Sequence, residues 1–227
     1  MLAARFELPG AAAPALDALL ELLHADPTAP TRITDPATAA DQHVADALVA
    51  LELGGVRGAR RIADLGSGAG FPGLVLAAAL PAAHVSLIES STKKCAFIER
   101  AAEAMGLANV EAVASRAEQW AAGIGRCDLV TARAVAPLNV LVEYAAPLLV
   151  EGGSLVAWKG RRNKAEEADG DAAAAATGLG SAEVRAVRPW DGAEHLHLHV
   201  FEKVGSTPNR YPRRPGMASK RPLRAGT

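Results

Sequence analysis

Three glycines, Gly66, Gly68 and Gly70, lie close together in the segment Arg61–Gly73, which reads RIADLGSGAGFPG. Glycine lets the backbone turn sharply and lets a ligand approach without a Cβ in the way. An apolar strand is expected before the glycines and a helix from Pro72 onward, whose free amides and partial positive charge would lie behind the turn. The pattern predicts a nucleotide-type site at the carboxyl end of the first strand of a doubly wound α/β sheet.

The spacing of the glycines indicates which nucleotide such a turn would bind. A dinucleotide fingerprint, G-x-G-x-x-G, needs a third glycine five positions after the first, but that position is Phe71. The pattern here is D-x-G-x-G-x-G, beginning at Asp64. Glu89 ends the next expected strand, where a carboxylate can accept both hydroxyls of a ribose. This combination resembles the Rossmann-like methyltransferases that bind S-adenosylmethionine, so we expect a cofactor site at Asp64, the three glycines and Glu89.

Two further segments follow expected strands and therefore face the same crevice. In Ser115–Gln119 (SRAEQ), the backbone of Ala117 and Glu118 can bracket an adenine, and Glu118 is a plausible acceptor. Ser115 and Glu118 also fit a capping box, and the two interpretations are compatible. Arg133, after the fourth strand, carries a planar donor fork that suits a carboxylate, a phosphate or a guanine edge, with a plain surface arginine as the alternative.

Motifs that are missing from the sequence narrow the chemistry. The segment Thr131–Pro137 lacks the Asn/Asp-Pro-Pro-aromatic motif of enzymes that methylate the amino groups of adenine or cytosine. Cys127 lies at the wrong end of its strand to serve as the nucleophile of cytosine C5 chemistry. His195, His197 and His199 alternate along one strand face, but no carboxylate or cysteine is spaced to complete a metal site, and we expect no metal.

Basic side chains gather after the fifth strand and at the end of the chain. Lys159, Arg161 and Arg162 form a cluster on the crevice edge that suits phosphate, with a solvated loop as the alternative. Residues 205–227 contain six basic residues and no acid, whereas the other 204 residues contain 18 basic and 25 acidic residues. This asymmetry indicates a basic arm that contacts RNA, or else a disordered solubilising tail. The expected RNA contacts in this arm are Arg210, Arg213 and Arg214.

The expected elements alternate between strands and helices once a short helical region has ended. Helices over 11–24 and 38–53 form an N-terminal cap, residues 1–58. Strands are expected at 61–65, 84–89, 110–114, 128–132 and 154–158, with helices or helical turns at 72–80, 91–105, 116–121 and 137–149 between them. A loop at 160–170, a helix at 172–176 and two strands at 183–188 and 195–203 follow. The pattern predicts an α/β, Rossmann-like seven-stranded sheet over 59–204, closed by an antiparallel hairpin, and a flexible tail over 205–227.

Length and composition agree with one domain and short appendages. The chain has 227 residues, half of them apolar, and a net charge of −1. No unbroken apolar run is long enough to span a membrane, and the acids Glu7 and Asp17 argue against a signal peptide. The two cysteines, Cys95 and Cys127, are expected to be buried thiols in a reduced compartment, the cytoplasm. Nothing in the sequence suggests an obligate interface, so we expect a monomer.

Taken together, the motifs resemble those of the RsmG (GidB) family, the small-subunit (16S) ribosomal RNA guanine-N7 methyltransferases. The blocks that carry the resemblance are DLGSGAGFPG, LIESSTKKCAFIE, SRAEQW, DLVTARAVAPLNVLVEYAAPLL, GGSLVAWKG and TPNRYPRRPG, and they cover about residues 34 to 223. ITDPATAADQHVADAL also resembles the family and places His43 and Asp46 at matching positions, although Pro-Thr-Arg at 30–32 replaces the family's Asn-Leu pair. The resemblance implies the 530-loop region of 16S ribosomal RNA in the small subunit as substrate, and S-adenosylmethionine bound by Gly66, Phe71, Ala117, Glu118 and Arg133.

This chemistry needs few catalytic groups. Guanine N7 already has a lone pair that points out of the ring, so proximity and orientation can supply most of the catalysis. We therefore expect no proton-transferring residue, and Arg133 and Lys159 would position RNA or cofactor. The alternatives are a methyltransferase of another RNA or of a small molecule, a non-catalytic RNA-binding assembly factor and, less well supported because of Phe71, a nicotinamide oxidoreductase.

Overall fold

A seven-stranded sheet forms the centre of the protein, and the computed structural model describes residues 1–226. The strands lie in the order β3-β2-β1-β4-β5-β7-β6. Their bounds are β1 Arg61–Leu65, β2 His84–Glu89, β3 Val110–Ala114, β4 Cys127–Arg133, β5 Leu149–Lys159, β6 Glu183–Val187 and β7 Leu196–Glu202. The first five strands are parallel, whereas β7 pairs antiparallel with both β5 and β6. The predicted α/β sheet with an antiparallel edge hairpin is thus confirmed.

The sheet has a topological switch point beside β1. The chain leaves β1 toward β2 and β3 on one side, and later returns to place β4 on the other side. Crossovers in opposite directions leave a crevice at the carboxyl ends of the strands, which is where open α/β sheets bind ligands. The turn after β1 and the ends of β2 and β4 therefore meet at one edge of the sheet.

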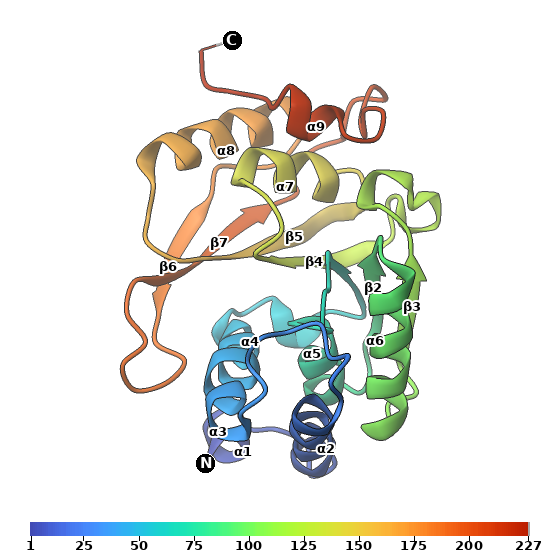
Figure 1. Ribbon diagram of the computed structural model, residues 1–227. Coiled ribbons are helices and arrows are strands. Elements are labelled where there is room, and N and C mark those ends of the chain that lie inside the picture. Colours follow the sequence, from blue (N-terminus) through green and yellow to red (C-terminus); the bar gives the residue numbers. More distant parts are fainter. Residues whose placement is uncertain (227) are drawn as a thin grey trace.

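Helices cover both faces of the sheet (Figure 1). On one face lie α7 Leu138–Ala145, α8 Lys164–Thr177 and α9 Met217–Lys220. The other face carries α1 Leu2–Arg5, α2 Ala12–Ala25, α3 Pro36–Ala39, α4 Asp46–Leu48, α5 Gly73–Ala79 and α6 Thr92–Ala104. None of the helices within residues 1–226 is both long and apolar enough to cross a bilayer.

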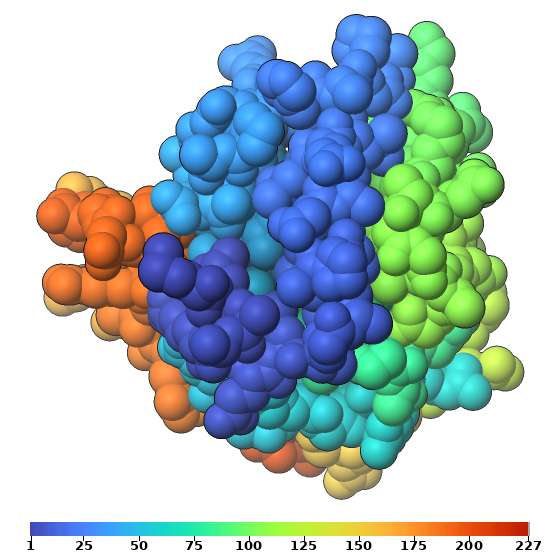
Figure 2. Space-filling model, turned by 90° about the horizontal axis from the view of Figure 1, so that it is seen from below, coloured from blue at the N-terminus to red at the C-terminus, as the bar shows by residue number. Residues whose placement is uncertain are grey.

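The N-terminal cap packs directly against the sheet layer. Leu19 and Leu23 of α2 and Leu48 of α4 are fully buried, and they belong to the same hydrophobic core as Ile62 and Leu76. Seen from below, the cap fills the centre of this face, with the β6–β7 hairpin on one side of it and the region of α6 on the other (Figure 2). The cap and the sheet therefore share one core.

Several element boundaries differ from those predicted. The predicted helix over 38–53 is present as an unbroken helical stretch over 36–52, in which α3 continues into the π-helical turn η1 (Ala40–Ala45), then α4, and then a 3₁₀ turn from Val49 to Glu52. The short helix α1 was not predicted. The predicted loop at 160–170 is wrong from Lys164 onward, since the Asn163 side chain caps α8 by accepting bonds from the amides of Ala165 and Glu166 at 3.0 and 3.2 Å.

The strand β5 begins earlier than predicted, and the helix before it ends earlier. β5 starts at Leu149, which pairs with Cys127, and the next pair joins Ser154 to Leu129. The intervening residues form a bulge, in which Gly152 has φ +80° and a Cβ at Gly153 would lie 2.9 Å from the Asp128 carbonyl oxygen. The two glycines therefore make a bulge inside the strand, not a turn before it.

The C-terminal segment follows a defined path over α7, which corrects the predicted flexible tail. Tyr211 and Ala218 are buried. The Asn139 side chain on α7 donates to the Leu223 carbonyl oxygen at 2.6 Å, and α9 lies beside α7 (Figure 1). A basic segment with these contacts is a docked part of the fold.

A buried lysine fixes the base of this segment. Lys203 Nζ donates to the carbonyl oxygens of Ala146 and Thr177, at 2.9 and 3.2 Å, and also contacts the Thr207 hydroxyl. Those two carbonyls lie at the ends of α7 and α8, where backbone acceptors lack helical partners. Burial lowers the pKa of Lys203, and its side chain ties both helix ends to the start of the tail.

We predict that Lys203→Met lowers the free energy of unfolding by about 2–3 kcal/mol, because buried carbonyls lose their donor. Urea unfolding monitored by circular dichroism measures this loss. The matched control is Lys220→Met, since Lys220 is exposed on α9. Equal midpoints for the two variants would contradict the role of Lys203.

Candidate functional site: the crevice at the switch point

The carboxylate of Asp64 lies beneath the glycine turn and is fully buried. Its Oδ1 accepts a hydrogen bond from the Thr131 hydroxyl at 2.8 Å, and its Oδ2 accepts one from the Gly73 amide at 3.2 Å. These bonds join the end of β1 to β4 and to the start of α5. Burial raises the pKa of Asp64 to about 6, against the effect of its hydrogen bonds. Because Asp64 is fully enclosed and bonded to β4 and α5, it supports the turn from below.

The three glycines of the turn all have positive φ, +65° at Gly66, +59° at Gly68 and +92° at Gly70. At Gly66 a Cβ would lie 2.7 Å from Val135, and at Gly70 it would collide with Leu74. At Gly68 the nearest atom would be 3.8 Å away. Packing therefore explains the first and third glycines, whereas the middle one leaves its backbone open to a ligand.

Glu89 faces this open glycine from the end of β2. Its Oε2 accepts from the Gly68 amide at 3.2 Å, and its Oε1 accepts from the Ser91 amide at 2.9 Å. The Lys94 ammonium lies 3.6 Å from Oε2. The structure thus brings together the glycine turn and the acidic strand end that the spacing predicted to be neighbours. The open backbone at Gly68, which a Cβ would narrow, lies beside the Glu89 carboxylate as hydrogen-bond acceptor. This arrangement fits a nucleoside with a free ribose diol.

Ala117 and Glu118 lie in the 3₁₀ turn η4 (Ala117–Gln119), after β3. The predicted capping box is wrong, because the Ser115 hydroxyl donates to the Arg116 carbonyl oxygen at 3.1 Å and forms no cap. Glu118 Oε1 instead accepts from the Gly216 amide at 2.9 Å. The C-terminal segment therefore reaches the crevice, which the sequence did not indicate.

Arg133 connects the end of β4 to the N-terminal cap. Its Nη1 donates to Asp46 Oδ2 at 2.8 Å and to the Gln42 carbonyl oxygen at 3.0 Å, and its Nη2 donates to His43 Nδ1 at 3.1 Å. The guanidinium also lies 5.3 Å from the centroid of the Phe71 ring. The partly buried Arg133 side chain thus connects the sheet with the cap and the glycine turn.

His43 completes this cluster as a neutral ring. It stacks on Phe71 with centroids 4.4 Å apart and an interplanar angle of 19°, and its Nε2 lies 2.9 Å from the Thr31 hydroxyl. Because Arg133 donates to Nδ1, the proton is on Nε2. Burial first, and then the Arg133 charge, lower the pKa of His43 to about 4. The ring therefore stays uncharged at neutral pH.

The partners of Asp46 were not identified from the sequence. Trp158, near the end of β5, donates its indole N–H to the Asp46 carbonyl oxygen at 2.7 Å. Burial raises the pKa of Asp46, while Arg133 acts in the opposite direction. A buried tryptophan needs a hydrogen-bond acceptor for its indole N–H, so the sequence could indicate that Trp158 has a partner. The sequence could not indicate that this partner is the Asp46 carbonyl oxygen.

The basic cluster after β5 divides into paired and exposed side chains. Lys159 Nζ lies 2.6 Å from Glu166 Oε1 and donates to the Ala136 carbonyl oxygen at 3.0 Å. Arg162 forms a bidentate pair with Glu167 at 2.8 and 2.7 Å. Arg161 is exposed. The spacing predicted the cluster, but not that its two neighbouring acids hold two of its members.

The predicted basic residues of the tail also differ from one another. Arg213 pairs with Glu143 of α7, a carboxylate that is 1% exposed, with Nε to Oε1 at 2.7 Å. The Arg210 guanidinium lies over the ring of Tyr211, 5.1 Å from its centroid. Arg214 is exposed. Of the alternating histidines, His199 is buried against Glu167 at 3.3 Å, and His197 Nδ1 lies 3.0 Å from the Gly160 carbonyl oxygen.

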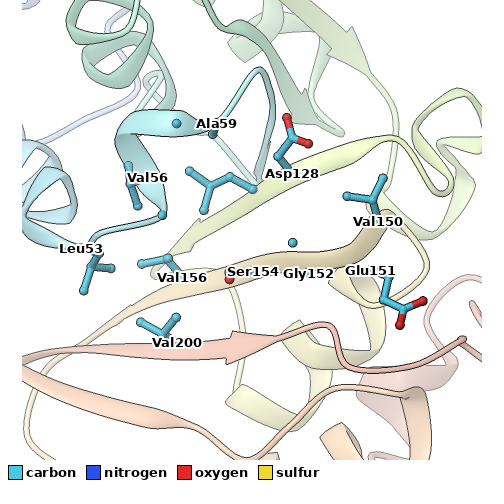
Figure 3. Close-up of a pocket in the computed structure, with 14 residues that line it drawn as sticks. Leu53, Val56, Ala59, Asp128, Val150, Glu151, Gly152, Ser154, Val156 and Val200 are labelled. Atoms are coloured by element: carbon cyan, nitrogen blue, oxygen red, sulfur yellow. The ribbon is translucent and has the colours of Figure 1, made fainter.

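A cavity of about 380 Å³ opens at the amino ends of β1, β4 and β5, on the opposite end of the strands from the crevice (Figure 3). Leu53, Val56, Val156 and Val200 contribute apolar surface to it, and Asp128 lies at its rim. Asp128 Oδ2 accepts from the amides of Arg60 and Arg61, at 2.8 Å each. The cavity lies at the amino ends of the strands, so it is separate from the crevice at the switch point.

The strand order, the glycine turn after β1 and the carboxylate at the end of β2 define an S-adenosylmethionine-dependent methyltransferase of the Rossmann-like class. Solved structures agree in fold. The S-adenosylmethionine-dependent methyltransferase SibL matches with a TM-score of 0.61 and 14% identity, covering 86% of this chain and 70% of its own. An Agrobacterium tumefaciens protein described as a predicted O-methyltransferase matches with a TM-score of 0.54 and 24% identity, covering 72% of this chain and 80% of its own.

The family model described as GidB, rRNA small subunit methyltransferase G, matches residues 20–196. The chain therefore belongs to this family, as the motifs predicted. Ribosomal RNA small subunit methyltransferase G of Rubrobacter xylanophilus is 43% identical over 198 residues, covering 85% of this chain and 76% of that protein. The protein of the same name from Deinococcus deserti is 40% identical over 232 residues, covering 98% of this chain and 95% of its own.

We predict a pH dependence of stability that His43 causes. Its pKa is about 4 in the folded protein and about 6.5 when unfolded, so between these values the unfolded chain binds the extra proton. Acidification through this window should lower the free energy of unfolding by up to about 3 kcal/mol. Asp64 acts in the opposite sense, because its pKa is raised by folding.

The comparison with His43→Phe isolates this contribution, since phenylalanine retains an aromatic ring against Phe71 and does not titrate. Urea unfolding at pH 7 and pH 5 should show a larger loss for the unchanged protein than for the variant. Parallel pH profiles would contradict the assignment of a depressed pKa to His43.

Proposed function

We propose that this protein transfers the methyl group of S-adenosylmethionine to N7 of a guanine in 16S ribosomal RNA, in the 530-loop region. The observation that carries the proposal is the intact crevice in a chain of this family, where Gly68 leaves its backbone open and the Glu89 carboxylate faces it. The φ of +59° at Gly68 and the open space at its Cβ position together let a ligand approach this backbone beside the acid.

The residues at the crevice suit each part of the cofactor. Gly66, Gly68 and Gly70 bring backbone close to it, Glu89 accepts the ribose hydroxyls, and Ala117 and Glu118 bracket the adenine. Phe71 and Arg133 form the wall toward the cap, with Arg133 held by Asp46. When bound, the cofactor supplies an activated methyl group on a sulfonium.

The protein's own residues contribute orientation to this reaction. Guanine N7 carries its lone pair at neutral pH, so the site needs to hold the base in line with the methyl group and does not need to remove a proton. Both ring nitrogens of His43 are engaged, by Arg133 and Thr31, which suits a structural ring and not a general base. Lys159, held by Glu166 and Ala136, positions the loop after β4.

The exposed cations around the crevice suit the phosphates of RNA. Arg161 follows β5, and Arg214 lies two residues before Gly216, which contacts Glu118. Arg210 lies beside Tyr211 toward the amino ends of β4 and β5, so it would extend the basic surface away from the crevice. Arg133, Lys159, Arg162 and Arg213, which were also predicted to contact RNA, are paired with acids. Arg133, Lys159 and Arg213 are partly buried and would support the surface from behind, whereas Arg162 is exposed beside its partner Glu167. A small substrate would require no such set of cations, which favours RNA over the small-molecule alternative.

We further propose that residues 59–204 act as the methyltransferase domain, and that residues 1–58 and 205–227 border its cofactor site. We also propose that the protein works as a monomer in the cytoplasm. The free thiols of Cys95 and Cys127, both buried, support a reduced compartment. Light scattering measures the oligomeric state directly.

The experiment that tests the function is methyl transfer from labelled S-adenosylmethionine to small-subunit particles isolated from cells that lack this gene. We expect label in 7-methylguanosine of the small-subunit RNA. Label in another nucleoside would support a different acceptor atom. Cofactor binding by calorimetry without transfer would favour the non-catalytic assembly factor.

We predict that Arg133→Ala lowers turnover at least tenfold and weakens cofactor binding, because Asp46, His43 and Phe71 lose the group that joins them. Arg126→Ala is the matched control, since Arg126 is an exposed arginine just before the other end of the same strand. Thermal unfolding of both variants separates a local effect from loss of the fold. Unchanged turnover and cofactor affinity in folded Arg133→Ala would refute the assignment.

A further inference from the structure

The contact between Glu118 and the tail is the point where two distant parts of the chain meet. Glu118 lies on the turn after β3, and the Gly216 amide that donates to its Oε1 at 2.9 Å lies just before α9. Gly216 has φ +78°, a left-handed backbone conformation that residues with a Cβ rarely adopt. A side chain proposed to face the adenine is therefore held by a backbone donor from the tail.

The path of the tail to this point depends on one ion pair. Arg213, three residues before Gly216, donates through Nε and Nη2 to the two carboxylate oxygens of Glu143, at 2.7 and 2.5 Å. Nη2 also donates to the Arg221 carbonyl oxygen at 2.9 Å, on the other side of α9. The arginine thus closes the loop that contains Gly216 and fastens it to α7, and Figure 1 shows α9 next to α7.

Burial makes this pair hard to separate. Glu143 is 1% exposed and lies on the buried face of α7, so loss of its cation would leave a buried charge without compensation. The geometry is bidentate, which a lysine cannot reproduce. The pair therefore serves as an anchor for the tail, whereas the adjacent Arg214 points to solvent.

We propose that the Arg213–Glu143 pair is a positioning pair for the cofactor site, acting through Gly216 and Glu118. The inference rests on the proposed function, because it assigns Glu118 to the adenine. A carboxylate has two oxygens and about four acceptor sites, so Gly216 occupies one side of Glu118 and restricts its rotamer while the other side stays available. The tail thus forms one wall of the cofactor site, and Arg213 acts from behind that wall and not as an RNA contact.

Arg213→Lys separates these two roles, because it keeps the charge that a phosphate would need and loses the bidentate bond to Glu143. We expect the dissociation constant of S-adenosylmethionine, measured by calorimetry without RNA, to rise at least fivefold. Arg214→Lys is the matched control and should leave cofactor binding unchanged. Unchanged cofactor affinity in Arg213→Lys, together with an altered salt dependence of RNA binding, would overturn the proposal and return Arg213 to the RNA contacts.

A double-mutant cycle shows whether the effect passes through Glu118. Glu118→Ala should weaken cofactor binding by itself, and Arg213→Lys should add little in that background, since coupled residues are not additive. Full additivity would mean that Arg213 acts by general destabilisation and would overturn the proposal. Hydrogen exchange at residues 214–221 should be faster in Arg213→Lys, which reports release of the tail independently of any ligand.

The proposed function and this inference fail in distinguishable ways. If the unchanged protein does not bind S-adenosylmethionine, the proposed cofactor site itself is wrong. If it binds the cofactor, and the tail of Arg213→Lys exchanges faster without any change in affinity, only the inference is wrong. Tighter cofactor binding on release of the tail would also overturn it, because Gly216 would then compete with the adenine for Glu118.

Discussion

The buried carboxylate of Asp64 is the interaction on which the crevice depends. It lies at the end of β1 and accepts hydrogen bonds from the Thr131 hydroxyl of β4 and the Gly73 amide of α5, so it joins β1 and β4, the two strands at the switch point, to α5. Burial raises its pKa, and a buried carboxyl group of this kind is stable only where its hydrogen bonds are satisfied. The glycine turn is built over this point, and Gly73 has no space for a Cβ because Asp64 and Leu87 lie within 3 Å of that position.

A second constraint joins the cap to the sheet. Arg133 binds Asp46, Gln42 and His43, and Trp158 holds the backbone of Asp46 from β5. The cap therefore contributes directly to the wall of the crevice, instead of covering the sheet as a separate unit. Methyl transfer to guanine N7 needs the reactants to be held in line and needs no proton transfer. Charged side chains that hold one another in place can provide this orientation. Burial and the nearby Arg133 charge keep His43 neutral, and the bonds to Asp46 and Gln42 hold Arg133 in place, so the geometry does not depend on flexible side chains.

The distribution of charge also has a structural logic. A net charge near zero conceals a basic segment at the C-terminus, and within that segment Arg213 and Arg214 have opposite environments although they are neighbours. One faces a buried acid on α7, and the other faces solvent. Lys159 and Arg162 likewise have acidic partners on α8, while Arg161 between them is exposed. Counting basic residues therefore overestimates the number that are free to meet phosphate, because short-range pairing removes several of them.

By itself the sequence determined the fold class, the alternation of strands and helices, the glycine turn and its acidic neighbour Glu89, because these depend on local periodicity and on spacing along one chain. It also predicted the family, whose motifs are local blocks. It did not reveal that Gly152 and Gly153 form a bulge or that the tail is docked, since each depends on a partner that is distant in sequence. The Asn163 cap of α8 is a local contact with Ala165 and Glu166, so it was open to prediction from the sequence and was missed. Tertiary structure alone decided which oxygen of Asp64 meets Thr131, that His43 stacks on Phe71, and that Gly216 reaches Glu118 across 98 positions of chain. Such contacts arise from the packing of whole elements, and no pattern along the sequence encodes them.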